Sequence, residues 1–410
     1  MRITLISQYF FPEQFSNNEI ARWLSDRGHD VGVVCGVPNY PVGTFFEGYD
    51  NRTRREETWQ GVRIHRARTV ARGQGKLQLM LNYITFPLTA SRTLRKKVGR
   101  QADVSFVSMP SPIFQALAGI YQKWRHGVPL VYWVQDIWPE SAVYTLNLHN
   151  PLVVRPLGWL CGWIYRRADL VLVQSAAFPA MIERFGVPPE RIRVFPNTAP
   201  ATYEPRQPDP DSPVGRMIPP GRFRLMFAGN IGESQDFDTY IAAAERLRDA
   251  GREVAWVIIG SGRDEARVKQ EIARRGLSDV FHFLGRHPEA AMPELFAHAS
   301  AMLVGLKSNP IFDLTVPYKV QCYMACGRPI VASLSGEGAR IVTQSGAGGV
   351  ATSQSPDELA AVIGRMFDAS DTERRKMGEA GRRFFEENYA AEKVYGDLER
   401  WLAAVARGAL

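Results

Sequence analysis

Short apolar, β-branched runs alternate along the chain with longer segments in which apolar residues recur at helical spacing. In the first half, the apolar runs predict buried strands at 3–7, 30–35, 104–107, 130–134, 170–173 and 192–195. The helical spacing predicts helices between them at 18–27, 113–124, 152–167 and 176–185. This βα alternation is typical of a doubly wound α/β domain with a parallel sheet.

Seven prolines lie between positions 200 and 220, and the alternation stops there. It restarts with predicted strands at 224–228, 254–259, 280–284, 302–306 and 330–334. We therefore predict a Rossmann-like domain at 1–200, a linker at 201–221 and a second Rossmann-like domain at 222–385. The end of the chain predicts two or three helices from position 371, and we expect 386–410 to pack back on the first domain.

A doubly wound sheet binds its ligands outside the carboxyl ends of the strands, so residues that follow a strand are the candidates for chemistry. One candidate is the start of a predicted helix, where Pro317 suits the first turn and Thr315 is a possible cap. Lys319 falls in this turn, where free backbone N–H groups and the helix dipole would join its ammonium to bind an anion, most naturally a phosphate. Taken alone, an ordinary surface lysine explains the position equally well.

Two glycine-containing loops follow predicted strands of the second domain and open helices. Small residues allow the backbone N–H groups of such loops to approach a phosphate. The candidates are Gly229, Asn230, Gly232 and Gln235 in the first loop, and Gly260 and Gly262 in the second. A tight turn is the simpler explanation for either loop alone, and Glu265 stands where a dinucleotide fingerprint requires a third glycine. Together with Lys319, however, they place three polar loops at the strand ends of one domain, which favours a nucleotide site.

Two charged side chains follow other strands of the second domain. Arg286 is a candidate to stack on a nucleotide base or bond to it, and an exposed arginine is an equal alternative. Glu337 is a candidate to accept hydrogen bonds from a ribose or sugar diol. The alternative for Glu337 is a carboxylate favoured by the dipole at a helix N-terminus.

In the first domain, two carboxylates follow the buried run at 130–134. Asp136 is a candidate to orient or deprotonate an attacking hydroxyl, and Glu140 lies four residues later. A helix cap is the alternative for Asp136. After the first strand, Glu13 is expected to face a ligand, while Ser16 or Asn17 is expected to cap the next helix. Ordinary turns explain these last three residues as well.

The net charge of +8 is concentrated in one segment, because residues 51–100 hold 13 basic and 2 acidic side chains. Within it, an apolar helical pattern precedes a cationic cluster, with Pro87 expected to kink or divide the helix. The apolar and aromatic candidates are Leu77, Leu81, Tyr83 and Ile84, and the cationic ones are Arg92, Arg95, Lys96 and Lys97. This combination suits the surface of an anionic membrane. A core-facing helix with a solvated end is the alternative, and nucleic acid ranks lower because no recognition motif is present.

Composition narrows the class of protein further. No apolar run approaches the length of about 20 residues that spans a bilayer. The four cysteines, Cys35, Cys161, Cys322 and Cys326, are scattered and lack partners for a zinc site, so a reducing cytosol is expected. The D-x-D pattern at Asp209 and Asp211 lies in the proline-rich linker, and we do not expect it to bind a metal ion.

The motifs taken together resemble those of glycosyltransferase family 4. The resemblance covers nearly the whole chain and is carried by R-L-M-F-A-G-N-I-G-E-S-Q-D, V-I-I-G-S-G, Y-M-A-C-G-R-P-I-V and the S-G-E loop. V-Q-D-I-W-P-E-S, which contains Asp136, and V-P-Y-K-V-Q-C-Y-M-A, which contains Lys319, are its most specific parts. These two are similar to a subgroup of bacterial O-antigen and capsule transferases that includes the N-acetyl-L-fucosaminyltransferases.

The resemblance implies a GT-B fold, with two doubly wound Rossmann-like domains facing a cleft. It implies a C-terminal domain that binds a sugar nucleotide, an N-terminal domain that binds the acceptor, and transfer without a metal ion or other cofactor, usually with retention. Lys319 and Pro317 would hold the donor diphosphate, Arg286 would lie near the base, and Glu337 near the ribose or the sugar. The acceptor would meet Glu13, Ser16, Asn17 and Glu140.

Several positions depart from the family pattern. Asn230 and Gln235 stand where an arginine and a lysine are common, and Lys319 would supply that charge. The E-x7-E motif is absent, because Leu314 and Cys322 occupy its two positions. Asp136 would replace a histidine that is common in the first domain. These departures leave the donor sugar open.

We therefore expect a cytoplasmic enzyme bound peripherally to the inner face of the plasma membrane. It would transfer a sugar, such as N-acetylfucosamine or a related deoxy or N-acetyl sugar, from a UDP donor to a polyprenyl-diphosphate-linked saccharide in O-antigen, lipopolysaccharide or polysaccharide biosynthesis. The alternatives are a UDP-sugar 2-epimerase of the same fold, and a non-catalytic protein that binds nucleotide sugars or a membrane surface. Turnover without an acceptor would indicate the first alternative, and binding without turnover the second.

Overall fold

The computed structural model describes residues 1–73, 75–146, 150–219 and 223–409. They form two compact units, which are described separately. Unit 1 contains Met1–Pro196 and Tyr395–Leu410, and unit 2 contains Asn197–Val394. The proline-rich segment expected as a linker is therefore part of unit 2 up to position 219, while 220–222 lie outside the described residues.

Unit 1 is built on an eight-stranded sheet with the order β3-β4-β2-β1-β5-β6-β7-β8. Its strands are β1 (Arg2–Ile6), β2 (Asp30–Cys35), β3 (Glu56–Trp59), β4 (Val62–Arg66), β5 (Val104–Met109), β6 (Leu130–Val134), β7 (Leu170–Val173) and β8 (Ile192–Val194). Neighbouring strands are parallel except for the antiparallel β3–β4 pair at one edge. All residues of β5, β6 and β7 are buried, because helices cover both faces of a parallel sheet.

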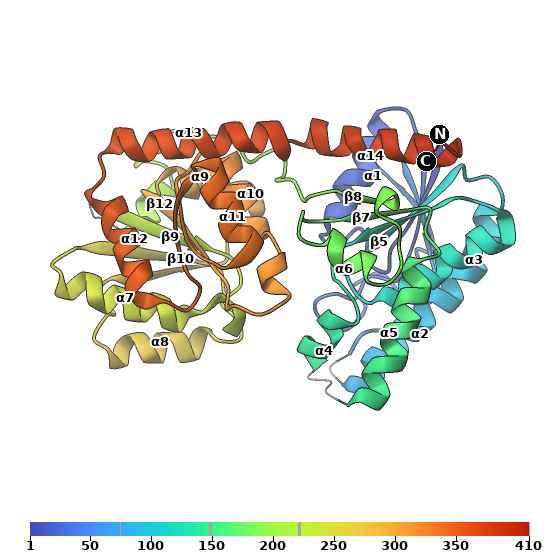
Figure 1. The fold of residues 1–410 in the computed structure, drawn as a ribbon, viewed down its shortest axis with the longest axis horizontal. Helices are drawn as coiled ribbons and strands as arrows, with labels where there is room; N and C mark the ends of the chain where they lie inside the picture. Colours follow the sequence, from blue (N-terminus) through green and yellow to red (C-terminus); the bar gives the residue numbers. More distant parts are fainter. Residues whose placement is uncertain (74, 147–149, 220–222, 410) are drawn as a thin grey trace. The chain divides into compact units, whose positions relative to one another are not determined.

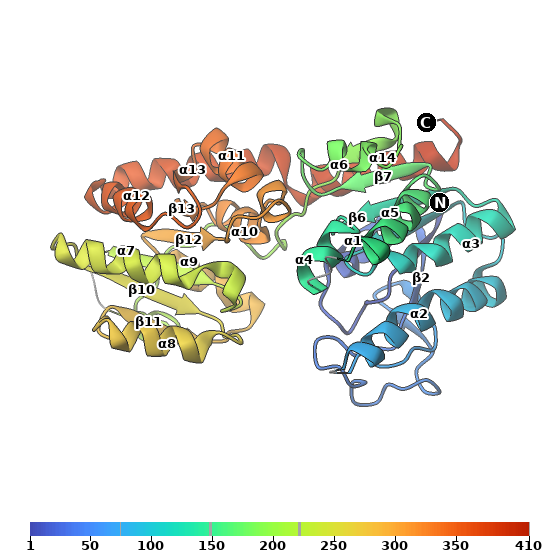
Figure 2. The ribbon, with the colours of Figure 1, turned by 60° about the horizontal axis from the view of Figure 1, so that its bottom comes forward.

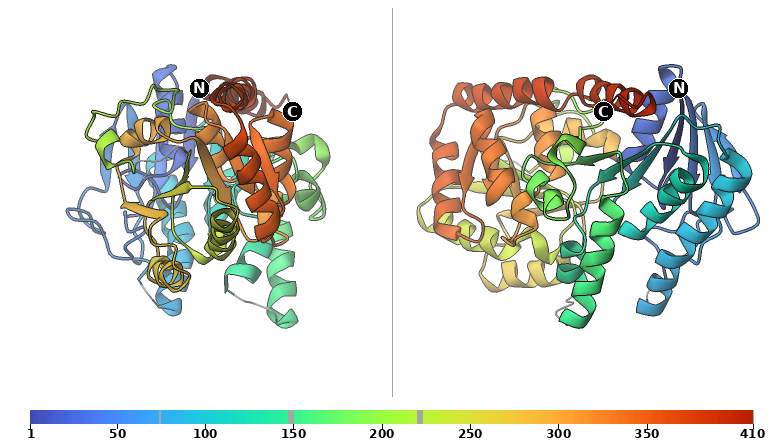
Figure 3. Two further views of the ribbon diagram at one scale, coloured as in Figure 1. Left: turned by 90° about the vertical axis from the view of Figure 1, so that its left-hand side faces the viewer. Right: turned by 45° about the vertical axis from the view of Figure 1, so that its right-hand side comes forward.

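The helices of unit 1 cover the two faces of this sheet. They are α1 (Ser16–Asp26), α2 (Lys76–Thr93), α3 (Ala116–His126), α4 (Glu140–Leu146), α5 (Pro151–Tyr165) and α6 (Pro179–Glu183). Helices α2, α3 and α5 lie side by side in one layer (Figures 1 and 2). Helix α1 lies on the opposite side of the sheet, next to α14 (Ala391–Ala406) (Figures 1 and 3).

The C-terminal part of α14 packs on unit 1 through its own buried face. Leu398 and Leu402 are fully buried, and the Tyr395 ring meets the Trp23 ring edge-on at 5.7 Å between centroids. The carboxylate of Glu399 accepts hydrogen bonds from Arg27 Nε at 3.0 Å and His29 Nε2 at 2.7 Å. Residues 395–409 thus complete unit 1, while Ala391–Val394 and helix α13 (Asp371–Asn388) belong to unit 2.

Unit 2 contains a six-stranded parallel sheet with the order β11-β10-β9-β12-β13-β14. Its strands are β9 (Phe223–Ala228), β10 (Val254–Ile259), β11 (Phe281–Gly285), β12 (Ala301–Gly305), β13 (Ile330–Ser333) and β14 (Gly348–Ala351). Helices α7 (Phe237–Asp249), α8 (Glu265–Arg274) and α12 (Pro356–Asp368) cover one face, and α9 (Met292–Ala297), α10 (Tyr318–Ala325), α11 (Gly336–Ser345) and α13 the other (Figure 1). Two apolar clusters, one for each face, form the core of unit 2. The predicted pair of doubly wound Rossmann-like domains is confirmed.

Several local predictions need correction. Pro87 does not divide α2, which continues through it to Thr93. Helix α1 has Phe15 as its N-cap, so neither Ser16 nor Asn17 caps it. Pro317 is the N-cap of α10 rather than its first residue, and the hydroxyl of Thr315 donates to the carbonyl of Ile311 instead of capping.

Within the described ranges, no helix is both long and apolar enough to cross a bilayer.

Candidate functional site

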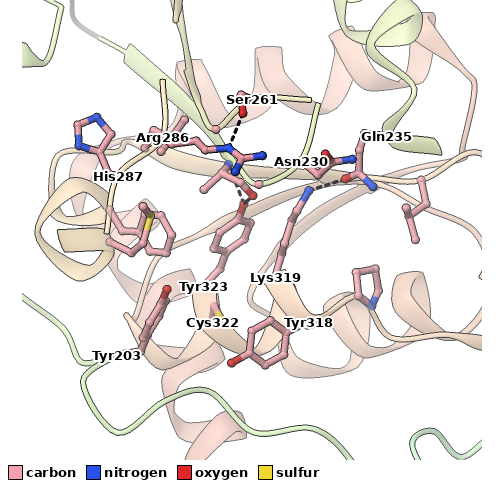
Figure 4. A pocket seen from close by; sticks show the side chains of 18 residues that line it. Tyr203, Asn230, Gln235, Ser261, Arg286, His287, Tyr318, Lys319, Cys322 and Tyr323 are labelled. Carbon is pink, nitrogen blue, oxygen red and sulfur yellow. Dashed lines mark hydrogen bonds between the residues drawn. The ribbon is translucent and has the colours of Figure 1, made fainter. Parts of the chain in front are cut away.

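A cavity of about 590 Å³ opens at the carboxyl ends of the strands of unit 2, where α10 begins (Figure 4). Loops after β9, β10, β11 and β12 contribute to its walls, as expected for a doubly wound sheet. The candidates predicted from the sequence that line it are Gly229, Asn230, Gln235, Gly260, Arg286, Pro317 and Lys319. Residues far apart in the sequence therefore meet at one site.

Lys319 extends from the first turn of α10 towards the loop after β9 (Figure 4). Its ammonium donates a hydrogen bond to Gln235 Oε1 and lies 3.8 Å from the centroid of the Phe227 ring. Burial lowers the pKa of Lys319 from 10.5 to about 7, because the low-dielectric surroundings disfavour the charged form. A bound anion would raise the pKa of Lys319 again, so a phosphate in the cavity would favour the protonated form of this side chain.

Two glycines of these loops are required by close backbone contacts. A Cβ atom on Gly260 would lie 1.9 Å from the carbonyl oxygen of Gly229, and one on Gly262 would lie 2.0 Å from that of Ile231. Gly229 and Gly260 also have φ angles of +141° and +126°, which side chains rarely adopt. Gly229 and Gly260 line the cavity, whereas Gly232 and Gly262 are not part of its lining. Gly262 therefore serves the packing of its loop, whereas a Cβ on Gly232 would meet only the Asn230 side chain.

Arg286 follows β11 and extends to the loop after β10, where its Nε donates a hydrogen bond to the Ser261 hydroxyl. Figure 4 shows the Arg286 side chain extending over the cavity that it lines. Glu337 lies elsewhere. It is buried near the start of α11 and forms a bidentate ion pair with Arg340, with distances of 2.7 and 2.8 Å. The structure thus gives Glu337 a partner within its own helix, and its contact with a ribose or sugar stays a prediction.

The remaining wall of the cavity is largely apolar and was not predicted. It is formed by Tyr203, Met292, Phe296, Leu306, Tyr318, Cys322 and Tyr323, with His287 beside Arg286. The Tyr323 hydroxyl accepts a hydrogen bond from Ala228 N at 3.2 Å, which fixes α10 to the end of β9. Tyr203 belongs to the proline-rich segment, and nothing in the sequence of that segment predicts that it lines a binding cavity. Cys322 and Tyr323 lie in the helix that the sequence predicted from Pro317, which is the one signal that could have placed them here.

In unit 1, Asp136 follows β6, as predicted. Asp136 is an exposed residue, while the protein atoms around its carboxyl partly desolvate it and raise its pKa from 3.8 to about 7. Glu140 begins α4 and forms an ion pair with Arg184 at 3.0 Å. Asp136 is thus the carboxylate of this loop that is poised to exchange a proton near neutral pH.

Glu13 is buried, with 3% of its surface exposed. Its carboxylate accepts backbone N–H bonds from Asn39 and Tyr40, both at 2.7 Å, and from Phe10 at 3.2 Å. Burial raises the pKa of Glu13 to about 7, opposed by these hydrogen bonds. Asn17 is also buried and donates to the carbonyl of Tyr9 at 3.0 Å, while Ser16 is the first residue of α1. Glu13 and Asn17 therefore hold loops together, which corrects the expectation that Glu13 faces a ligand.

The residues predicted to meet a membrane form one exposed stripe along α2 and the turn of π-helix at Leu94–Val98. Leu77, Leu81 and Ile84 keep 66%, 41% and 47% of their surface exposed, and Tyr83 is half-buried. Arg92, Arg95, Lys96 and Lys97 are exposed beyond them. Lys97 is paired with Glu56 at 2.6 Å, and the basic end lines a second cavity of about 510 Å³.

Across the described part of the chain, no three His, Cys, Asp or Glu side chains gather as they would at a metal site.

Comparison with known proteins bears on both units. Residues 16–198 match the family described as "Glycosyl transferase 4-like domain", and residues 213–384 match "Glycosyl transferases group 1". The chain belongs to the family 4, group 1 glycosyltransferases. This glycosyltransferase is 26% identical to the colanic acid biosynthesis glycosyl transferase WcaI of Escherichia coli over 328 residues, which cover 75% of the chain and 76% of the relative.

Two further comparisons cover more of the molecule. The glycosyltransferase is 28% identical to the MMP alpha-(1->4)-mannosyltransferase of Mycolicibacterium hassiacum over 402 residues, or 92% of the chain and 90% of the relative. Its fold is similar to that of HepE from Anabaena in complex with UDP-glucose, with a TM-score of 0.70, 16% identity, and coverage of 98% and 100% of the two chains. The GT-B fold expected from the sequence is therefore confirmed.

Proposed function

We propose that this glycosyltransferase moves a sugar from a UDP-sugar to a polyprenyl-diphosphate-linked saccharide during bacterial O-antigen or related polysaccharide biosynthesis. The sugar is N-acetylfucosamine or a related deoxy or N-acetyl hexose. The name of the Escherichia coli relative, which refers to colanic acid biosynthesis, supports this direction. The Anabaena structure supports a uridine donor, because its protein binds UDP-glucose on a similar fold.

One observation carries the assignment of the donor site. Lys319 projects from the start of α10 into a cavity at the strand ends of unit 2, beside Gly229 and Gln235. A diphosphate there would contact an ammonium and the positive end of a helix. Both favour the negative charge that develops on the leaving nucleoside diphosphate, so they stabilise the transition state of transfer. We propose that this charge serves in place of a metal ion, and that transfer proceeds with retention.

The acceptor is proposed to bind unit 1. Asp136 is the group we assign to the acceptor hydroxyl, because a carboxylate whose pKa is raised towards 7 can accept a proton at neutral pH. Glu140 and Ser16 remain candidates for acceptor contacts at the same ends of the strands.

The exposed stripe on α2 supports a peripheral position on the inner face of the plasma membrane. Its apolar part would enter the interface, and the arginines and lysines that follow would meet anionic headgroups. Helix α5 lies in the same layer and adds Leu152 and Trp159, which keep 83% and 71% of their surface exposed (Figure 2). Tryptophan is common at membrane interfaces, which strengthens this proposal.

The proposed function is tested by measuring release of UDP from a panel of UDP-sugars, with and without polyprenyl-diphosphate-linked N-acetylglucosamine. Release that requires the acceptor and is lost in Lys319→Met supports the transferase and the diphosphate role together. Release that does not require any acceptor would indicate an epimerase. Binding of UDP-sugars without turnover across a panel of lipid-linked acceptors would indicate a binding protein.

A further inference from the structure

Arg72 lies among tyrosines at the carboxyl ends of neighbouring strands in unit 1. It is in the segment between β4 and α2, while Tyr9 follows β1 and Tyr40 follows β2. These three strands are adjacent and parallel in the order β4-β2-β1, so the segments that follow them meet at one edge of the sheet. Tyr83 of α2 reaches the same place and interacts with Arg72.

The guanidinium of Arg72 is held by aromatic groups. Its Nη1 donates to the Tyr9 hydroxyl at 3.2 Å, and its Cζ lies 5.4 Å from the centroid of the Tyr40 ring. Within the described part of the chain, no carboxylate forms an ion pair with it. Arg72 is half-buried, and the side chains that contact its guanidinium are neutral tyrosines. A guanidinium in this state is suited to a bidentate contact with a phosphate.

Hydrogen bonds to neighbouring loops fix the position of Arg72. The Arg72 backbone N–H donates to Asn39 Oδ1 at 2.9 Å, and the N–H of Asn39 donates to the buried Glu13 carboxylate. Tyr9 is buried beneath the guanidinium, with its ring 5.3 Å from the stacked ring of Phe15. Glu13 and Tyr9 are therefore positioning residues, while Arg72, Tyr83 and the half-exposed Tyr40 face a ligand.

Two neighbours indicate what kind of phosphate would bind. Asp136 is close enough to raise the pKa of Tyr83, although burial raises it more. Asp136 follows β6, which runs parallel to β1 in the same sheet, so it lies at the same carboxyl edge of the sheet as the cluster. Tyr83 also belongs to α2, whose Leu77, Leu81 and Ile84 are exposed. A molecule that reaches from Arg72 along α2 would present a phosphate to the guanidinium and a hydrocarbon chain to the helix.

We propose that Arg72, with Tyr83 and Tyr40, binds the diphosphate of a prenyl-diphosphate-linked acceptor. This assignment rests on the proposed function and adds an acceptor subsite to it. In the bound state the guanidinium contacts the diphosphate oxygens, the phenolic hydroxyl of Tyr83 donates to them, and the prenyl chain follows the exposed side of α2. The saccharide then extends towards Asp136.

The experiment measures binding of citronellyl diphosphate, a short prenyl diphosphate, by calorimetry with UDP at a saturating concentration. Saturating UDP fills the donor cavity, so that the probe cannot bind there. We expect Arg72→Met to weaken binding of this probe by about tenfold or more, because a charge-assisted bidentate contact is lost. We expect Tyr83→Phe to weaken it less, by about threefold, since one neutral hydrogen bond is lost.

Arg63→Met is the matched control. Arg63 lies at the other end of β4, is exposed, and forms an ion pair with Asp30. Its replacement should leave the affinity for citronellyl diphosphate within about twofold of the native value, because a surface ion pair contributes little. Thermal unfolding of each variant reports whether the chain remains folded, and Tyr83→Phe keeps the test valid if Arg72→Met does not fold.

The results separate this proposal from the proposed function. If the native chain binds the probe and Arg72→Met does not, the subsite stands even if no UDP-sugar is turned over. Equal binding by the native chain and the Arg72 and Tyr83 variants would overturn the proposal. Equal affinity of the native chain for inorganic pyrophosphate and citronellyl diphosphate would overturn the assignment to a lipid diphosphate, because the hydrocarbon would then contribute nothing.

Discussion

Gln235 Oε1 accepts a hydrogen bond from Lys319 Nζ and so joins the loop after β9 to the start of α10, across 84 residues of sequence. A neutral amide accepts one hydrogen bond from the ammonium but does not compensate its charge. Burial therefore lowers the pKa of Lys319 to about 7, and an anion in the cavity would raise it again.

The first prediction follows from this linkage. Anionic UDP-glucose should bind the protonated form of Lys319, so affinity is highest below pH 7 and falls as the pH rises above it, by up to about tenfold per pH unit. Calorimetry at pH 6, 7, 8 and 9 measures the slope, and buffers of different ionisation enthalpy report the proton taken up. Lys319→Met should bind more weakly with a flat profile. A flat profile in the native chain would contradict the prediction.

A second prediction concerns the close contact between the two glycine loops. Gly260→Ala should lower the free energy of unfolding of unit 2 by about 3 kcal/mol, because its Cβ would lie 1.9 Å from the Gly229 carbonyl oxygen. Gly232→Ala is the matched control, since its Cβ would meet only the flexible end of Asn230. Urea unfolding followed by circular dichroism compares them, and an equal loss in both variants would mean that the backbone contact is not decisive.

The third prediction separates transfer from donor binding. Asp136→Asn should reduce transfer by about 100-fold or more, as for a lost general base, while the affinity for UDP-glucose stays within twofold. Donor affinity is spared because every residue of the donor cavity belongs to unit 2. In the native enzyme, activity should rise with pH through an apparent pKa between 3.8 and about 7, since the ionised carboxylate is the active form. Glu140→Gln serves as the control, and an equal loss there would shift the assignment away from Asp136.

A fourth prediction tests the C-terminal helix. Tyr395→Ala should destabilise unit 1 by about 3 kcal/mol, because a buried aromatic ring that packs on Trp23 is removed. Arg400→Ala, at an exposed position of the same helix, should change stability by less than about 0.5 kcal/mol. Denaturant unfolding of the full chain measures both, and similar values for the two variants would argue against a structural role for this part of α14.

The fifth prediction concerns the membrane. A variant with Leu77→Gln, Leu81→Gln and Ile84→Gln should lose binding to vesicles that contain anionic lipid, measured by flotation. Replacing Arg95 and Lys96 by Gln should remove about 1 kcal/mol per charge at low salt and nothing at high salt, because salt screens surface charges. Replacing exposed Arg52 by Gln is the control. Native binding to vesicles that does not depend on any of these residues would point to another surface.

The sequence predicted the central strands and the edge strands β8 and β11, but it missed β3, β4 and β14 for physical reasons. β6 and β10 are buried on both faces, so their sequences are continuous apolar runs with clear ends. The β3–β4 hairpin lies at a half-exposed edge, and β14 begins with two glycines, so neither has such a run. Pro87 does not divide the helix, because a helix on the surface of a folded unit tolerates a proline that would break an isolated helix.

The sequence predicted where the site lies in the fold more reliably than it predicted which groups each side chain contacts. Lys319 and the two glycine loops could be placed together because carboxyl ends of parallel strands share one edge. The environments of Glu13 and Glu337 could not be predicted, since a carboxylate has the same sequence signal whether it meets a ligand, a backbone N–H or an arginine. Tyr203 could not be found either, because the path of a proline-rich segment depends on tertiary packing.

The backbone contact between Gly229 and Gly260 also divides the donor cavity into a part that cannot change and a part that can. Gly260 cannot take a side chain there, because its Cβ would meet the Gly229 backbone, so new selectivity could not arise at this position without rebuilding the two loops. The wall that carries His287, Met292 and Phe296 has no such restriction. Divergence towards new nucleotide sugars, and laboratory evolution for the same purpose, should therefore accumulate substitutions on that wall.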